Sequence, residues 1–358
     1  MTLDMGERLR RRKIQPDAGS VRGRVIALYA GLIAFNLAVW VWALIACRGR
    51  YVLLGTALAA YGFGLRHAVD ADHIAAIDNV TRKLTQERQK PLGVGLFFAL
   101  GHSSVVILAS ALVALMTSSV GAHLREAREI GATLGTVVSF GFLWLIGTAN
   151  LLSLPSSLAA LRQVRRRDGG IPPDLEALLA QQGFVARWLQ PVFRLVRRSR
   201  DMFALGALFG LGFDTASEVL LLGISAAQAA HGMSIASTLL FPALFTAGMT
   251  LIDTSDGVLM TGAYGWAFIN PVRKLRYNVI VTLLSVTVAF LVGGVEALGL
   301  IRDRLGLEGS FARHVAAWNG HPEALGFGVI GLFIFCWLVS AGAHRWGAWR
   351  ATGLGQRP

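Results

Sequence analysis

The chain has 358 residues, of which 54% are hydrophobic and 15% are charged, and its mean hydropathy is +0.55. This balance excludes a soluble domain with an ordinary charged surface and predicts an all-α, polytopic integral membrane protein that contacts membrane lipids. A net charge of +13 is common among nucleic-acid-binding proteins, but the basic residues lie in separate loops, so we expect no nucleic-acid partner.

Long apolar runs predict the membrane-spanning helices. A helix needs about 20 residues to cross roughly 30 Å of hydrocarbon. Five uncharged runs reach that length, at 25–46, 92–116, 132–152, 277–295 and 324–343. Three further apolar segments contain acidic residues, at about 52–78, 202–228 and 236–262. The sequence therefore predicts about eight transmembrane helices in one transmembrane domain over 25–343.

The basic residues predict the orientation of the chain. Lys and Arg are concentrated before the first span, between the second and third, over 162–200, and after the sixth and eighth spans. By the positive-inside rule these segments are cytoplasmic. Both termini are then cytoplasmic, as the tails 1–24 and 344–358, together with the loop 153–201. That loop fits either short basic helices on the anionic membrane surface or a solvated connector.

The segment RHAVDADHI at 66–74 places charged groups inside the second predicted span. A charge at the bilayer centre costs roughly 3 kcal/mol on insertion scales. Six acidic residues lie well inside the predicted spans, namely Asp70, Asp72, Asp214, Glu218, Asp253 and Asp256, whereas Arg66 is the only basic residue in such a position. Protons, a bound cation or a water-filled cavity must therefore compensate most of the carboxylates.

The residue types in this segment favour a transition metal. The segment combines two imidazoles with two carboxylates and no thiolate, a set that suits Ni²⁺, Co²⁺, Zn²⁺ or Mn²⁺ better than Ca²⁺ or Mg²⁺. The four side chains are those of His67, Asp70, Asp72 and His73. They do not share one face of a regular helix. Either the helix is broken there and all four reach the ion, or His67 and Asp70 bind it and the other two support them.

Three other segments place polar groups in apolar surroundings. FFALGHSSVV at 97–106 contains His102, which fits an interhelical hydrogen bond as well as metal ligation. The other two segments, 211–219 and 244–268, each carry two acidic residues. These are Asp214 and Glu218 in the first, at i and i+4, and Asp253 and Asp256 in the second, at i and i+3. Each spacing puts both carboxylates on one helix face.

Two short similarities suggest an internal repeat. Residues 62–74 are similar to 210–222, and residues 96–101 are similar to 244–248. A shift of three spans reverses the direction of the chain across the membrane. The result would be an inverted repeat, an arrangement that places a substrate site near the midplane.

Together these motifs resemble the nickel/cobalt transporter family, NiCoT, whose signature H-A-x-D-A-D-H-I matches residues 67–74 without a departure. The segments 97–106, 211–219 and 244–268 are similar to its other motifs. The resemblance implies secondary uptake of Ni²⁺, Co²⁺ or both across a bacterial cytoplasmic membrane. The ion is then a transported substrate, and no prosthetic group is implied. The implied metal ligands are His67, Asp70, Asp72 and His73, and the implied pathway residues are His102, Asp214, Glu218, Asp253 and Asp256.

Two alternatives to metal uptake can be weighed from the sequence. His67 and Asp72 also fit the H-x-x-x-x-D pattern of acyltransferases, but that pair would have to lie at a membrane surface and not about 15 residues into a span. A metal exporter would be expected to have His-rich tracts, whereas the eight histidines here are scattered. No G-x-x-x-x-G-K-[ST] phosphate-binding loop is present, so no ATPase subunit is implied. The sequence predicts a transporter and not an enzyme.

Overall fold

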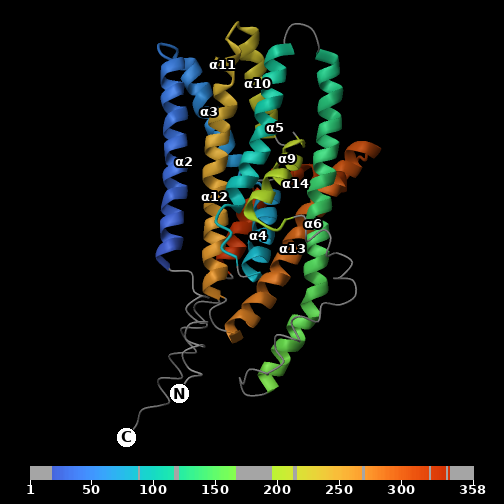
Figure 1. The fold of residues 1–358 in the computed structure, drawn as a ribbon. Coiled ribbons are helices and arrows are strands. Elements are labelled where there is room, and N and C mark those ends of the chain that lie inside the picture. Colours follow the sequence, from blue (N-terminus) through green and yellow to red (C-terminus); the bar gives the residue numbers. More distant parts are fainter. Residues whose placement is uncertain are drawn as a thin grey trace.

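The computed structural model in Figure 1 is a bundle of helices. It describes residues 18–87, 89–116, 121–166, 196–212, 216–267, 271–321, 324–335 and 338. In chain order the elements are α2 (Ala18–Ala46), α3 (Tyr51–His67), α4 (Ala71–Gln86), α5 (Val94–Met116), α6 (Gly121–Arg166), the short η1 (Ser199–Asp201), α9 (Met202–Gly210), α10 (Ala216–Ala230), α11 (Ile235–Thr238), α12 (Leu240–Ala267), α13 (Pro271–Leu305) and α14 (Ser310–Asn319). These ranges contain no strand, which confirms the all-α prediction.

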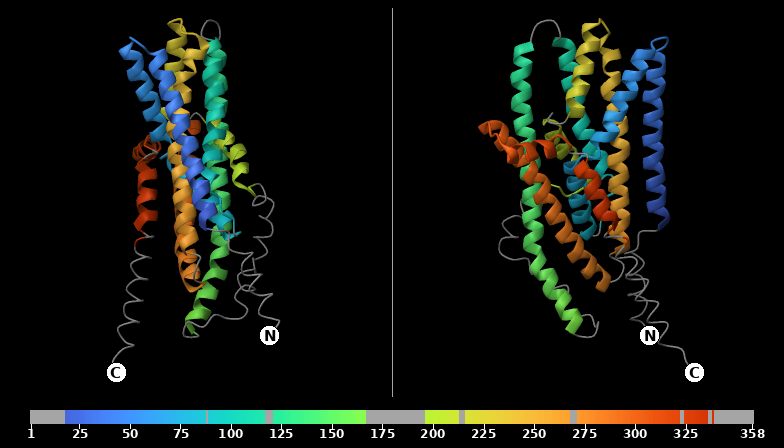
Figure 2. Two further views of the ribbon diagram at one scale, coloured as in Figure 1. Left: turned by 60° about the vertical axis from the view of Figure 1, so that its left-hand side comes forward. Right: turned by 180° about the vertical axis from the view of Figure 1, so that it is seen from behind.

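The central helices are α3, α4, α5, α9, α10 and α12 (Figure 1). Helix α2 packs on one side of this group and the long pair α6 and α13 on the other, as Figure 2 shows from two further directions. Many large apolar side chains on α2 and α6 face outward, including Leu37, Ile45 and Leu134. A surface of this kind suits contact with lipid, where helices satisfy their own backbone hydrogen bonds.

Within the described ranges, five helices are long and apolar enough to cross a membrane. They are Val21–Ala46, Val94–Leu115, Thr133–Ala159, Ile235–Gly265 and Val279–Leu305, and the bent pair α3 and α4 would add a sixth. Two shorter apolar helices cover Ser217–Ala230 and Ala324–Phe335. A multi-pass membrane protein is therefore confirmed, while eight spans and the orientation of the termini stay predictions. Most of the predicted tails and residues 167–195 of the predicted loop lie outside the described residues.

The second predicted span is broken into two helices. Helix α3 ends at His67 and α4 begins at Ala71, with a bend of 51° between them. In the break, the amides of Val69 and Asp70 donate to the carbonyl oxygens of Arg66 and His67, each at 3.0 Å. Asp70 then has extended backbone angles, φ −61° and ψ 142°, and precedes the first residue of α4. The helix is therefore broken in this segment, while which of its four side chains reach an ion stays a prediction.

Two helix crossings in the centre of the bundle are so close that only glycine fits. A Cβ atom on Gly64 of α3 would lie 2.0 Å from the carbonyl oxygen of Phe245 on α12. In the same way, a Cβ on Gly206 of α9 would lie 2.0 Å from the carbonyl oxygen of Phe98 on α5. The crossing of α3 with α12 is therefore repeated by the crossing of α9 with α5.

At each crossing the second helix also contributes a glycine, which lies against a backbone carbonyl of the first. A Cβ on Gly248 of α12 would lie 2.7 Å from the carbonyl oxygen of Tyr61, and one on Gly101 of α5 would lie 1.9 Å from that of Phe203. The pairing of residue 101 with residue 248 agrees with the similarity of 96–101 to 244–248. For α3 and α9, the sequence similarity and the packing give different registers. The similarity aligns residue 64 with residue 212, whereas the packing makes Gly64 equivalent to Gly206. The packing supports an internal repeat, with α3 to α5 equivalent to α9 to α12.

These crossings predict which glycines the fold needs. Gly64→Ala and Gly206→Ala should each destabilise the protein by about 1–3 kcal/mol, because the new methyl group would overlap a backbone carbonyl that cannot move freely. Gly62→Ala is the matched control, since no atom lies within 4 Å of a Cβ at that position. Thermal unfolding of detergent-purified variants measures the difference. Equal unfolding midpoints for all three variants would contradict the packing of these crossings.

Candidate metal site

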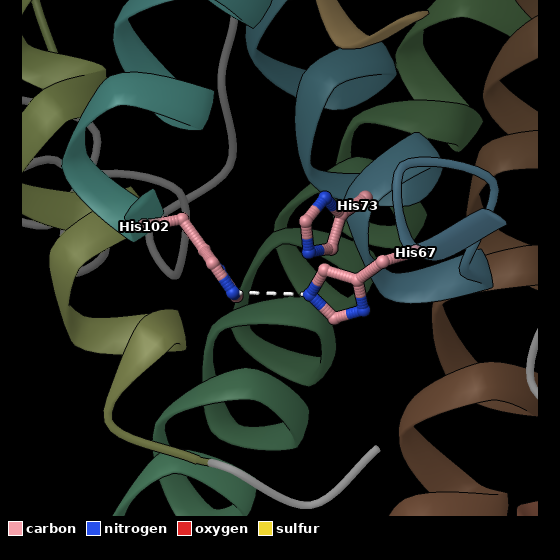
Figure 3. A group of neighbouring side chains, drawn as sticks. All are labelled: His67, His73 and His102. Carbon is pink, nitrogen blue, oxygen red and sulfur yellow. Dashed lines mark hydrogen bonds between the residues drawn. The ribbon is translucent and has the colours of Figure 1, made fainter. Parts of the chain in front are cut away.

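Three histidines from separate parts of the chain meet inside the bundle. His67 is the last residue of α3, His73 lies in the first turn of α4 and His102 lies in α5. One ring nitrogen of each lies within 4.8 Å of those of the other two, and Figure 3 shows the imidazoles gathered in one place. Their exposed fractions are 2%, 0% and 2%. In one regular helix His73 would point about 240° around from His67, so the break is what brings these two together.

The contacts of His67 hold its ring in one orientation. Its Nδ1 lies 2.8 Å from Oδ2 of Asp70, and its Nε2 lies 3.0 Å from Nε2 of His102. A carboxylate can only accept, so Nδ1 donates and a neutral His67 presents the lone pair of Nε2 to the centre of the cluster. A carboxylate that orients a histidine in this way is typical of metal sites. The position of Asp70 thus suits orienting His67.

Two more carboxylates reach the cluster from other helices. Oε1 of Glu218, on α10, lies 2.9 Å from Nε2 of His102 and 3.8 Å from Nε2 of His67. Oδ2 of Asp253, on α12, lies 3.4 Å from Nδ1 of His73. Bonds from an ion to nitrogen or oxygen are about 2.0–2.2 Å long, which places neighbouring ligand atoms roughly 3 Å apart. The spacing of His67, His102 and Glu218 therefore suits one small cation between them.

Several polar atoms of the cluster have no hydrogen-bond partner among the described residues. They are Nε2 of His73, Nδ1 of His102 and Oδ1 of Asp253. Buried polar atoms without a partner are costly. Coordination of a cation would relieve this cost, and it would also offset the negative charge of the buried carboxylates.

Aromatic rings close the site. Phe98 packs against the ring of His73 with centroids 4.8 Å apart, and Phe245 packs against His67 at 5.4 Å. Both phenylalanines are fully buried. They occupy equivalent places in the two helix crossings of the repeat, so the cluster lies between the two halves. An ion bound here would be separated from water on all the described sides.

The structure brings most of the predicted site residues together, but not all of them. It brings together six of them, namely His67, Asp70, His73, His102, Glu218 and Asp253. Asp72 is adjacent to the cluster, but its Oδ1 accepts a hydrogen bond from the backbone amide of His73 at 2.9 Å. Asp256 is one helical turn beyond Asp253, and its Oδ2 has no partner among the described residues. Asp214 lies outside the described residues.

Residues 53–342 match the model of a protein family, NicO, described as high-affinity nickel-transport protein. The chain belongs to the NicO family. NicO membership identifies a membrane transport protein and not an enzyme, which sets aside the acyltransferase alternative. It also bears out the resemblance of the four sequence motifs to nickel/cobalt transporters.

Similar NicO proteins carry names that refer to nickel or cobalt. A protein of Cupriavidus necator named "High-affinity nickel transport protein" is 53% identical over 329 residues, 92% of this chain and 94% of that protein. "Hydrogenase nickel incorporation protein HupN" of Bradyrhizobium diazoefficiens is 48% identical over 94% of this chain and 87% of its own length. "Cobalt transport protein NhlF" of Rhodococcus rhodochrous is 40% identical over 80% and 81%, respectively. No solved structure matches the chain.

The geometry predicts that His102 matters as much as His67 for metal binding. His67→Ala and His102→Ala should each abolish saturable Ni²⁺ binding to the purified protein, because each removes a nitrogen that faces the centre of the cluster. Asp72→Asn should weaken binding by about 10–100-fold and leave a measurable site, since Asp72 bonds a backbone amide. Calorimetric titration decides between these outcomes, with the exposed His314→Gln as the control. Saturable binding by His102→Ala at the affinity of the unaltered protein would exclude His102 as a ligand.

Proposed function

We propose that this NicO protein imports Ni²⁺, Co²⁺ or both across a bacterial cytoplasmic membrane, with the ion as its transported substrate. The observation that carries this proposal is the buried group of three histidine nitrogens within 4.8 Å of one another. Imidazole nitrogens with a few carboxylate oxygens are a favourable ligand set for both ions. The names of the relatives, which mention nickel transport and cobalt transport, support the same two ions.

The proposed ligands are His67, His73 and His102, completed by the carboxylates of Glu218 and Asp253. Asp70 holds His67 in the ligating orientation, and Asp72 stabilises the first turn of α4 by accepting from its backbone. The ion would replace the contact between the two Nε2 atoms of His67 and His102, which are 3.0 Å apart. Coordination by the neutral imidazoles and ionised carboxylates would replace the hydration shell that the ion loses on entry.

The membrane potential can supply the driving force. Each charge that moves inward gains about 2.3 kcal/mol per 100 mV of inside-negative potential, so a divalent ion gains roughly twice that amount. Basic residues support the orientation that this direction requires. The start of α2, whose sequence includes Arg22 and Arg24, lies at the same end of the bundle as the end of α4, whose sequence includes Lys83 (Figure 1). By the positive-inside rule this end is cytoplasmic.

Alternating access follows from the position of the ion between the two halves of the repeat. His67 and His73 belong to the first broken span, and Asp253 lies on α12, which crosses it. His102 and Glu218 approach from α5 and α10 on the other side of the cluster. Motion of α4 or α10 relative to the helices that cross at the centre would separate these ligands and open the site to one face of the membrane at a time. No ATP hydrolysis is part of this mechanism.

The ligand set predicts that metal affinity depends on pH. Imidazole must be neutral to bind a metal, and an unperturbed imidazole titrates near pH 6.5. Affinity of the purified protein for Ni²⁺ should therefore fall as the pH drops from about 7.5 to 5.5, by roughly up to tenfold for each histidine that ligates. Binding isotherms at several pH values measure this effect. A constant dissociation constant across the range would argue against imidazole ligation.

Uptake by intact cells tests the function itself. Cells that produce the protein should accumulate radioactive nickel or cobalt from low external concentrations, and an excess of the other ion should compete if both share one site. His67→Ala, at equal abundance in the membrane, should reduce accumulation to that of cells without the protein. If the unaltered protein gives no accumulation of either ion, the proposed function is wrong.

A further inference from the structure

Helix α4 holds a second group of buried polar side chains beyond the histidine cluster, and neither the sequence motifs nor the metal site involves it. Asp78, Asn79 and Arg82 project from α4 and are at most 3% exposed. Their partners come from three other helices. These are Tyr264 on α12, Thr282 and Ser285 on α13, and Asn150 on α6. We refer to these seven residues as the α4 latch.

Direct hydrogen bonds connect the members of the α4 latch. The hydroxyl of Tyr264 donates to Oδ1 of Asp78, and the hydroxyl of Ser285 donates to its Oδ2 at 3.0 Å. Nη1 of Arg82 donates to Oγ1 of Thr282 at 2.8 Å. Nδ2 of Asn150 donates to Oδ1 of Asn79 at 2.9 Å. One half-helix is thus joined to three neighbours by four polar contacts.

The α4 latch lies between the metal site and the basic end of the bundle. Asp78 is five residues beyond His73 and Arg82 is nine residues beyond it, which corresponds to about 8 Å and about 13 Å along the helix axis. Asp256 lies on the same side, one turn past Asp253 on α12. Its Oδ2 is buried and has no partner among the described residues. A cation that leaves the histidines toward this end would first meet that carboxylate.

Both halves of the broken span pack through apolar side chains, and α4 adds the four polar contacts of the latch. Helix α3 packs against α12 through apolar side chains and the glycine crossing, with Gly64 in contact with the backbone of Phe245. Separation of α3 from α12 would expose apolar surface and would break the close backbone contacts at the glycine crossing.

Apolar side chains of α4, including Ile77 and Leu84, are buried as well and would also be exposed if α4 moved. Its polar contacts, in contrast, can be exchanged for contacts with water at a small net cost. Water would also solvate the buried charges of Asp78 and Arg82.

We propose that α4 is the cytoplasmic gate of the transport path, and that the α4 latch keeps this gate closed while the ion is bound. The proposal rests on the proposed function for the identity of the ion. Release then requires α4 to move away from α12 and α13, so that the latch contacts pass to water and the ion leaves past Asp256. Helix α3 stays packed on α12 during this step.

A reversible cross-link tests whether α4 must move. Asn79→Cys and Asn150→Cys would be combined in a chain that also has Cys47→Ala and Cys336→Ala, and joined with a short bifunctional methanethiosulfonate reagent. Cross-linking should reduce nickel uptake at least tenfold, and a reductant should restore it. Each single-cysteine variant, compared with its own uptake before treatment, should lose less uptake with the same reagent than the cross-linked pair does. Undiminished uptake by protein that mass spectrometry shows to be fully cross-linked would overturn the proposal.

Solvent access to α4 gives a second test that needs no metal. Thr81 is fully buried beside the latch and its hydroxyl has no partner among the described residues, so Thr81→Cys is a mild probe in the same cysteine-free chain. A membrane-impermeant thiol reagent applied to the cytoplasmic side should label this cysteine slowly. Tyr264→Phe removes one latch contact and should raise the labelling rate by roughly two- to tenfold.

Tyr29→Phe is the matched control for this labelling. It removes a tyrosine hydroxyl that donates to Ser255 at 3.0 Å, a contact between α2 and α12 outside the latch. Labelling of Thr81→Cys should be unchanged by this control. Equal rates with and without Tyr264→Phe would refute the gate. Because no metal is added, this outcome is independent of nickel uptake by the unaltered protein, whose failure would instead refute the proposed function.

Discussion

The metal site depends on the interruption of one helix at residues 68–70. A continuous helix through this segment would direct His67 and His73 to different faces, and the two could not share an ion. The break costs backbone hydrogen bonds that a membrane does not replace, so it persists only where protein covers it. Here the cover is tight, because a Cβ on Gly326 would lie 1.6 Å from the carbonyl oxygen of Val69. The helix Ala324–Phe335, far along the chain, therefore helps to shape the site.

Charge explains why such a costly arrangement is useful in a membrane. Glu218 and Asp253 are buried with the three histidines. When no cation is bound, protons on the imidazoles or carboxylates must neutralise the buried negative charge. A divalent ion supplies the missing positive charge and satisfies the polar atoms that lack partners. The protein would then bind the ion through the same groups that are costly to bury without it, and such a site could alternate between an ion and protons.

The fold class, and the segment that carries two of the three clustered histidines, could be predicted from the sequence, because a long apolar run folds as a membrane helix and carboxylates inside it need a compensating positive charge. The individual roles of Asp70 and Asp72 could not, since they depend on which hydrogen bond each oxygen makes after the break. The role of His102, as a metal ligand or as an interhelical hydrogen bonder, could not be predicted for a similar reason. A lone histidine in an apolar helix becomes part of a cluster only through the crossing of α5 with α9 at Gly101 and Gly206. The latch residues were missed because the sequence around Asp78 and Arg82 is that of an ordinary polar helix end, and their burial comes from packing against α13.

The two halves of the repeat interlock, and this limits how the site can open. Helix α3 of the first half crosses α12 of the second, while α9 of the second crosses α5 of the first, so neither half can leave the other as a whole. Opening must therefore come from segments that lie outside these crossings. The described segments that meet this condition and also carry proposed ligands are α4 and α10. Helix α4 lies toward the basic end of the bundle and α10 toward the opposite end (Figure 1). Because each half-helix carries ligands at its first turn, displacement of either one both uncovers the ion and weakens its coordination, which couples release to opening.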